Sequence, residues 1–119
     1  MAYNSIFTGA QIDEAVDRAL GGAPFGSQIT ADYTLALEDA GKMFLVNSSS
    51  AVTITVSSDV DFPVGTEIEF CRFGSGAVTF AESGTTIYSV SNAKSIADQY
   101  GCVCLKRIGT NWLLAGGLG

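Results

Sequence analysis

Histidine is absent from this 119-residue chain, and basic residues are few. Without His, catalysis by Ser-His-Asp or Cys-His groups and every His-ligated metal site are excluded. The 6 Lys and Arg residues stand against 12 Asp and Glu residues, which gives a net charge of −6 at pH 7. Proteins bind the phosphates of nucleic acids through clustered Lys and Arg, so we expect no nucleic-acid partner.

A basic amino-terminal region and long apolar runs are also missing. The opening residues Met1–Asn4 carry no basic side chain, and no apolar run approaches the ~18 residues that a membrane span needs. We therefore expect neither a signal peptide nor a membrane partner. The hydrophobic fraction of 47% is nevertheless too high for a disordered chain, and the length fits one domain.

Cysteine is scarce, and its pattern fits no zinc site. The three cysteines are Cys71, Cys102 and Cys104. Cys102 and Cys104 lie two apart in an extended run, so they share a sheet face while their Cβ atoms diverge. We predict that all three are reduced, packed thiols, as suits a protein assembled in a cytoplasm.

An amphipathic helix is predicted at residues 8–20. Thr8 and Gln11 form a capping-box pattern, and Phe7 and Ile12 occupy the positions of a hydrophobic staple. The spacing of one apolar stripe is helical, with members Ile12, Ala15, Val16, Ala19 and Leu20. Gly21 and Gly22 follow its last turn and end it.

A helix of about three turns is marginal alone in water, so its stripe needs a cover. It either docks on the sheet of its own chain or meets copies of itself or a partner surface, and the Gly-rich stretch that follows favours the second. We therefore divide the chain into a docking and trimerisation segment (1–22), a linker (23–30) and a β domain (31–119). The residues expected at the trimer or partner interface are Ile6, Phe7, Ile12, Val16 and Ala19.

From residue 29 onward the pattern is that of short strands. Residues 52–56 alternate strictly between Val or Ile and Thr, and residues 66–70 alternate so that Glu67 and Glu69 face water. Strands are predicted at 33–37, 43–47, 52–56, 66–73, 77–81, 85–88, 100–108 and 111–115. Hairpin turns are predicted at 74–76 and 109–111. The stretch 91–99 is a loop or a single helical turn.

These strands predict a mainly β fold. Eight short strands with frequent turns are typical of an antiparallel β-sandwich or barrel, here preceded by one short α-helix. Parallel neighbours usually need a helical crossover, and no helical pattern separates the strands. We therefore expect no parallel sheet.

Acidic side chains offer two candidate chemical sites. Asp59 and Asp61 lie in one loop but lack the further acidic ligands of a calcium loop, so they are interpreted as solvated turn residues. Glu67 and Glu69 could act as a glycosidase pair, yet they are neighbours on one strand rather than opposed across a cleft. Neither pair predicts catalysis or metal binding.

The remaining motifs also predict no catalytic or binding chemistry. Residues 74–77 join strands and carry no Lys, so they are no phosphate loop, and the Ser run at 48–50 has no base partner. Trp112 with Tyr100 or Tyr88 could stack on a sugar, but an aromatic residue in a sandwich strand more often belongs to the core. We predict no catalytic, cofactor or metal residue and no enzyme.

Several segments, taken in order, resemble a small β module of bacteriophage virion proteins, often found at the carboxyl end of tail-fibre chains. The matching segments are LEDAGK (37–42), VTITV (52–56), FPVGTEI (62–68), GSGAVTF (74–80) and GTNW (109–112). The opening FTGAQIDEAV (7–16) is similar to helical segments that precede fibre domains.

The resemblance implies a structural role in the virion, with assembly in the cytoplasm of the bacterial host. No shaft repeat accompanies the module, which favours a homotrimeric capsid decoration protein, of the cement or head-fibre kind, bound to the major capsid protein or another virion protein. The alternative is a short tail-fibre or receptor-binding tail protein that recognises a host surface glycan.

Overall fold

The computed structural model describes residues 25, 26 and 28–119, which form a mainly β domain. Two short 3-10 turns, η2 (Leu37–Asp39) and η3 (Val90–Asn92), accompany the strands. The strands are β1 (Tyr33–Thr34), β2 (Met43–Val46), β3 (Val52–Ser57), β4 (Glu67–Arg72), β5 (Val78–Ser83), β6 (Ile87–Ser89), β7 (Cys102–Ile108) and β8 (Asn111–Gly116). All eight predicted strand positions are confirmed, with β1 shorter than expected. The predicted helix lies outside the described residues.

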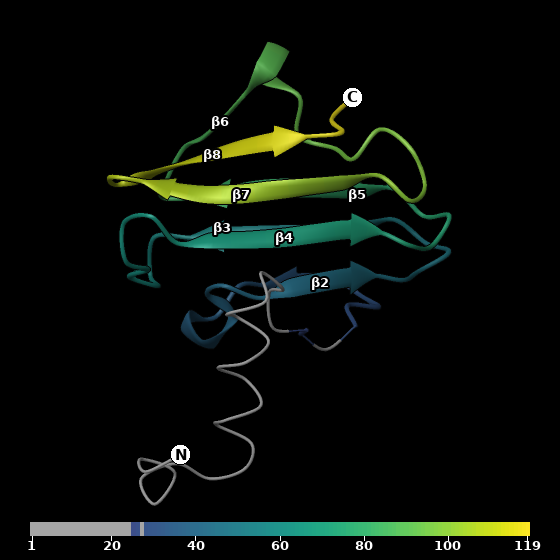
Figure 1. Cartoon of the computed structure of the whole chain (residues 1–119), viewed down its shortest axis with the longest axis horizontal. Coiled ribbons are helices and arrows are strands. Elements are labelled where there is room, and N and C mark those ends of the chain that lie inside the picture. The colour runs from purple at the N-terminus through teal and green to yellow at the C-terminus, as the bar shows by residue number, and fades with distance from the viewer. Residues whose placement is uncertain (1–24, 27) are drawn as a thin grey trace, which may run out of the picture.

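The strands form two layers. One sheet has the order β1-β3-β5 and the other the order β2-β4-β7-β8-β6. In Figure 1 the larger sheet faces the viewer, and β3 and β5 lie behind it. The two-layered arrangement expected of a sandwich is therefore present.

The prediction of a purely antiparallel fold is wrong. β1 and β5 pair with β3 in parallel, β2 pairs with β4 in parallel, and β6 pairs with β8 in parallel. From β1 to β5 the chain crosses from one sheet to the other at every connection, so each strand lands beside the strand two before it and points the same way. This winding brings parallel strands together through a strand of the opposite sheet, without a helical crossover.

Each turn of this winding through the two sheets is here called a rung. Over the last two rungs the repeat is constant, at 26 residues. Met43 faces Glu69 in one sheet, and Val52 faces Val78 in the other, at the same offset. The sequence repeats as well, because six of the fifteen residues at 43–57 recur 26 positions later. A period of this length is typical of stacked repeats that bury a continuous core.

The corners between the two sheets stack backbone on backbone. The Gly74 amide donates to the Val46 carbonyl at 3.1 Å, and the Gly76 amide donates to the Ser48 carbonyl at 2.8 Å. A Cβ atom at Gly76 would lie 2.0 Å from the Ser50 carbonyl oxygen. Residues 74–76 are thus a corner between sheets and not the predicted hairpin, and glycine is required by this close approach.

The carboxyl-terminal strands extend the larger sheet. β7 pairs antiparallel with β4, and β8 folds back on β7 through the predicted hairpin at Gly109. In the smaller sheet, the segment 94–96 bonds along the edge of β5, where the Phe80 amide donates to the Lys94 carbonyl and the Ile96 amide to the Val78 carbonyl. The stretch 91–99 is therefore largely a loop that covers a sheet edge.

Aromatic rings centre the core between the two layers. Phe70, fully buried, stacks on Phe44 of the preceding rung at 5.7 Å and meets Phe80 of the opposite sheet edge-on at 5.1 Å. Phe62 and Trp112 form a second edge-on pair at 5.2 Å. Phe44 and Phe70 are equivalent positions of the 26-residue repeat, so the repeat places one ring above the next.

One carboxylate is buried beside this core. Asp39, 3% exposed, accepts hydrogen bonds from the Tyr33 hydroxyl at 2.7 Å and from the Ala36 amide at 2.8 Å. Burial raises the pKa of Tyr33 to about 12, and the bond to Asp39 adds to the shift. The pair ties β1 to η2 at the start of the domain.

Replacing Gly76 by Ala is expected to destabilise the domain by about 1–3 kcal/mol, because the new methyl group collides with the backbone of the neighbouring corner. Gly117→Ala is the matched control, since a Cβ at that position would make an ordinary 3.6 Å contact. Urea unfolding of both variants measures the difference. Equal unfolding free energies would show that the corners do not need the close approach.

Stability should fall as the pH rises from about 10 to about 12, because folded Tyr33 keeps a proton that the unfolded chain loses near pH 10. The contribution is complete below pH 10 and disappears as the pH passes the folded pKa. Tyr33→Phe removes this part of the pH dependence, and Tyr88→Phe, at an exposed tyrosine, serves as the control. The measurement is the unfolding free energy across this range, and the idea fails if all three proteins lose stability in parallel.

Candidate functional site

One end of the domain collects three connections. The corner after β2 (47–51), the corner after β4 (73–77) and the loop before β7 (97–101) form what we call the corner face. The arrows of β2 and β4 point toward this end and that of β7 points away from it (Figure 1). The corner stacking described above places the first two connections against each other.

Two aromatic rings stand out on the corner face. Phe73 and Tyr100 pack edge-on, with ring centroids 5.7 Å apart. They remain 47% and 68% exposed, so the pair contributes little to the core. Large exposed aromatic side chains with a defined mutual geometry are typical of binding surfaces.

The backbone that presents Tyr100 is strained. Tyr100 has a φ of 69°, a left-handed conformation that residues other than glycine seldom adopt. The Tyr100 amide donates to the Arg72 carbonyl at 2.5 Å, and the Gly101 amide donates to the Asp98 carbonyl at 3.0 Å. Strain of this kind persists only where the surroundings enforce it, and it gathers at functional positions.

Arg72 and Gln99 fasten the loop to the corner. The Arg72 guanidinium donates to the Ser75 carbonyl at 2.6 Å and, more weakly, to the Ile96 and Ala97 carbonyls at 3.4 Å. The Gln99 amide group donates to the Phe73 carbonyl at 3.0 Å. These bonds hold the backbone that carries the two rings before any ligand arrives, which lowers the entropy cost of binding.

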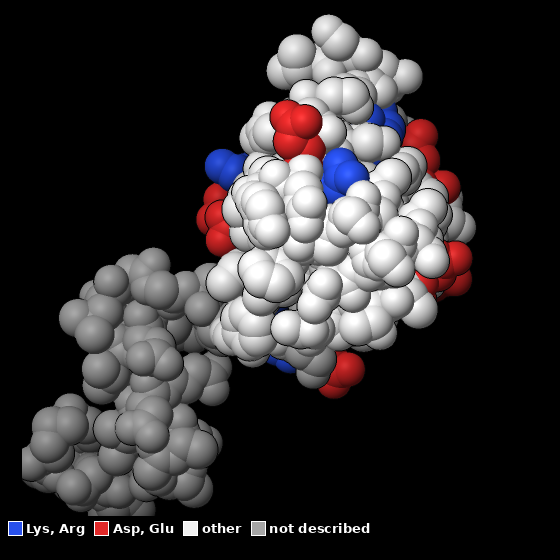
Figure 2. Space-filling view, turned by 90° about the vertical axis from the view of Figure 1, so that its right-hand side faces the viewer, with Lys and Arg blue, Asp and Glu red and all other residues white. Residues whose placement is uncertain are grey.

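Charged side chains are few on this end of the molecule. Figure 2 looks at it directly: white, uncharged atoms cover most of the described surface, and a few Lys, Arg, Asp and Glu side chains are scattered among them. Apart from the aromatic pair, the corners consist mainly of small residues: Asn47, Ser48, Ser49, Ser50, Gly74, Ser75 and Gly76. Aromatic rings among Ser, Gly and Asn on rigid supports can bind a partner by contact and hydrogen bonding, without chemical reaction.

The aromatic residues weighed from the sequence separate into core and surface. Trp112 is 1% exposed, and the Arg107 guanidinium lies 5.7 Å from its ring centre. Its interpretation as a core residue is confirmed. Tyr88 is 51% exposed and pairs in register with Leu113 on the outer face of the larger sheet, and Tyr100 instead joins Phe73.

The acidic pair lies on the outer face of the larger sheet, facing water as predicted. Glu67 forms an ion pair with Lys106 at 3.3 Å, and both side chains are well exposed. Beside them a shallow groove of about 490 Å³ is lined by Lys42, Glu67, Glu69 and Cys104, among others. Burial, with the neighbouring charge of Glu67, raises the pKa of the Cys104 thiol. The groove thus holds no activated nucleophile.

The loop carboxylates are exposed. Asp61 lies 3.9 Å from the Arg107 guanidinium with its side chain fully exposed. Within residues 25, 26 and 28–119, no group of three or more Cys, Asp and Glu side chains is placed to hold a metal ion. In the same part of the chain, no helix is long and apolar enough to cross a membrane.

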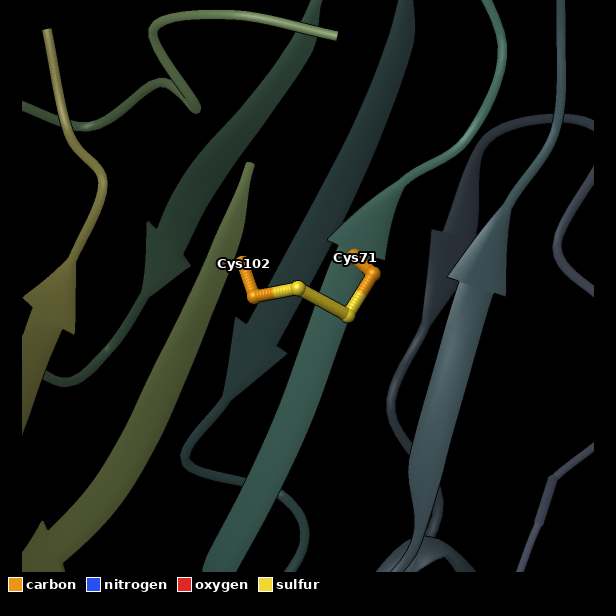
Figure 3. Close-up of a disulfide and its surroundings, with 2 residues drawn as sticks. All are labelled: Cys71 and Cys102. Atoms are coloured by element: carbon orange, nitrogen blue, oxygen red, sulfur yellow. A yellow bond between two sulfur atoms is a disulfide. The ribbon is translucent and has the colours of Figure 1, made fainter. Parts of the chain in front are cut away.

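The prediction of three reduced thiols is wrong. Cys71 on β4 and Cys102 on β7 form a disulfide, which crosses between the two strands in Figure 3. Spacing along the chain relates Cys102 only to Cys104, which lies two residues away on the same strand. The two bonded cysteines are instead opposed in the antiparallel register, with Cα atoms 4.2 Å apart, whereas Cys104 stays a free thiol.

The sequence patterns did not indicate most residues of the corner face as candidates for function. The 26-residue repeat was the available signal, because it makes Phe73 the equivalent of Asn47 at a solvent-facing corner. An aromatic residue at such a position is not explained by packing. The five interface residues predicted in the amino-terminal segment, from Ile6 to Ala19, lie outside the described residues.

Comparison with known proteins assigns no family to the domain or to its corner face. The chain matches no protein-family model, and no curated protein is significantly similar to it.

Proposed function

We propose that this chain is a structural protein of a bacteriophage virion, a homotrimeric capsid decoration protein. The segment 1–22 attaches it to the major capsid protein or another virion protein through Ile6, Phe7, Ile12, Val16 and Ala19. The β domain projects from the shell and displays the corner face. The proposal rests on the resemblance of the segments at 37–112 and on a rigid β domain whose most organised surface is built for contact.

The preorganised corner face is the observation that supports this role best. Arg72 and Gln99 hold the backbone beneath its rings, on corners that stack through glycine. A surface outside the core is thus organised by hydrogen bonds and by close backbone contacts. A decoration protein needs a stable body that survives outside the cell and a surface turned to the medium. The net charge of −6 also suits a protein displayed in many copies, because like charges keep neighbouring particles apart.

A second function is favoured by the aromatic pair alone. A short tail-fibre or receptor-binding tail protein would use Phe73 and Tyr100 as a platform for the apolar face of a sugar ring in a host glycan. The largely uncharged surface of the corner face suits a neutral saccharide better than an anionic one, since the whole chain is acidic. The two functions differ in copy number, which is high for decoration and low for a tail tip.

The purified full chain is expected to form a trimer at micromolar concentration. Three amphipathic segments can bury the stripe around Ile12, Val16 and Ala19 at one axis, which a single copy cannot do. Light scattering should then give three times the chain mass of 12.4 kDa. A particle of single-chain mass would contradict trimer formation.

Virions lacking the protein should regain surface density in electron micrographs when the full chain is added back. A variant without residues 1–22 should fail to bind, because each large apolar side chain buried at the contact contributes about 1.5–3 kcal/mol before ordering costs. Hundreds of copies per particle would support decoration and a handful would support the tail. Equal binding by the shortened chain would refute attachment through segment 1–22.

The corner face is tested with the double variant Phe73→Ala, Tyr100→Ala in the same capsid-binding assay and in a measurement of virion adsorption to host cells. Tyr88→Ala is the matched control, at an exposed tyrosine of the outer sheet face. A decoration protein attached through its amino-terminal segment keeps capsid binding in both variants. Loss of adsorption to host cells in the double variant alone would favour the receptor-binding function.

A further inference from the structure

Three cysteines lie on the outer face of the larger sheet, although only two are bonded to each other. Cys71 is half-buried, Cys102 is exposed and Cys104 follows on the same face of β7. The residues that alternate with them, Phe70 and Val103, point into the core and are 0% and 2% exposed. The disulfide therefore lies outside the core, on the solvent side of the sheet (Figure 3).

Opening this disulfide exposes no side chain that is buried in the core. β4 and β7 remain joined over five register pairs, from Glu67 with Lys106 to Cys71 with Cys102. The core beneath is also closed by the neighbouring strands β2 and β8. A small thiol can approach the exposed Cys102 side without unfolding the sheet.

The register of β4 against β7 is the property that the disulfide fixes. A slip by one residue would turn the apolar residues outward, but a slip by two keeps the alternation of inner and outer side chains. The two-residue slip would place Cys71 opposite Cys104 and give Glu69 the Lys106 partner that Glu67 now has. The side chains of the outer face therefore do not distinguish the two registers. On the inner face, the two-residue slip would place the half-buried Arg107 opposite Ile68.

We propose that the Cys71–Cys102 disulfide is a thiol-accessible register lock. Small thiols and disulfides open and close it in the folded protein, and when closed it holds the observed β4–β7 register against the register shifted by two residues. Cys104 is the position at which the lock would close wrongly. The raised pKa of Cys104 keeps that thiol protonated and slow to attack its neighbours.

The closing chemistry needs an oxidant of the small-disulfide class, such as oxidised glutathione. The thiolate of one protein cysteine attacks the small disulfide, forms a mixed disulfide and releases one glutathione thiolate. The thiolate of the second cysteine then attacks the protein sulfur of the mixed disulfide and expels the second glutathione. The two protons of the protein thiols end on the two released glutathione thiols, and reduction runs the same steps backwards.

The first experiment treats the oxidised full chain with reduced glutathione under native conditions. Iodoacetamide trapping and peptide mass spectrometry follow the opening of the disulfide, and circular dichroism follows the β structure. We expect complete opening with unchanged β structure, and an unfolding equilibrium constant that rises a few hundredfold on reduction, as a loop of this length predicts. Opening only in urea, or no change in the unfolding constant, would overturn the lock.

The second experiment tests the register with two single variants. Cys104→Ser keeps the native pair, and Cys102→Ser leaves Cys71 and Cys104 as the only possible pair. We expect Cys104→Ser to close in glutathione buffer as the natural chain does. The equilibrium constant for closing Cys102→Ser should be at least about tenfold lower, because its two sulfur atoms are diagonal and not opposed. Equal closing constants in the two variants would refute register selection.

Discussion

The contact of one corner's backbone with the next is the constraint on which the rest of the domain depends. Because Gly74 and Gly76 leave no side chain between the corners, the chain can repeat at a fixed offset of 26 residues in both sheets at once. That offset sets Phe70 above Phe44 and keeps the apolar sides of the strands facing the same interior. The parallel pairing and the stacking of aromatic rings in the core both accompany this close approach.

Strand positions were predictable because alternation and turn residues are local signals. The sequence 52–56 shows its inner and outer faces without reference to any partner, and Gly109 marks its hairpin correctly. Pairing is not local, and the glycines at 74–76 are compatible with a hairpin as well as with a corner between sheets. The repeated pattern of Ala-Val-Thr at 51–53 and 77–79 distinguishes the two, because equivalent residues of stacked rungs lie side by side in parallel.

The candidate site was less predictable than the fold, for a physical reason. Phe73 and Tyr100 are 27 residues apart and meet only because β4 and β7 are antiparallel neighbours. The same pairing joins Cys71 to Cys102, and spacing along one strand gave no information about it. The role of Arg72 was equally unpredictable from the sequence. Its guanidinium donates to the carbonyl groups of Ser75 and Ile96, which belong to two different connections between strands. The sequence alone indicated which residues of a strand are exposed or buried. It did not indicate which residues of other strands or connections lie opposite them.

The closed disulfide also limits how far the domain can be drawn out by force. Cys71 and Cys102 are separated by 31 residues, so the stretch that holds β5, β6 and the loop before β7 forms a covalent ring. Tension applied to the two ends of the chain passes through the sulfur atoms and bypasses this ring. About 100 Å of contour length stays hidden as long as the bond is intact. When the two ends of the chain are pulled, the first rungs would therefore unfold and extend, whereas the segment with β5 and β6 would add no length.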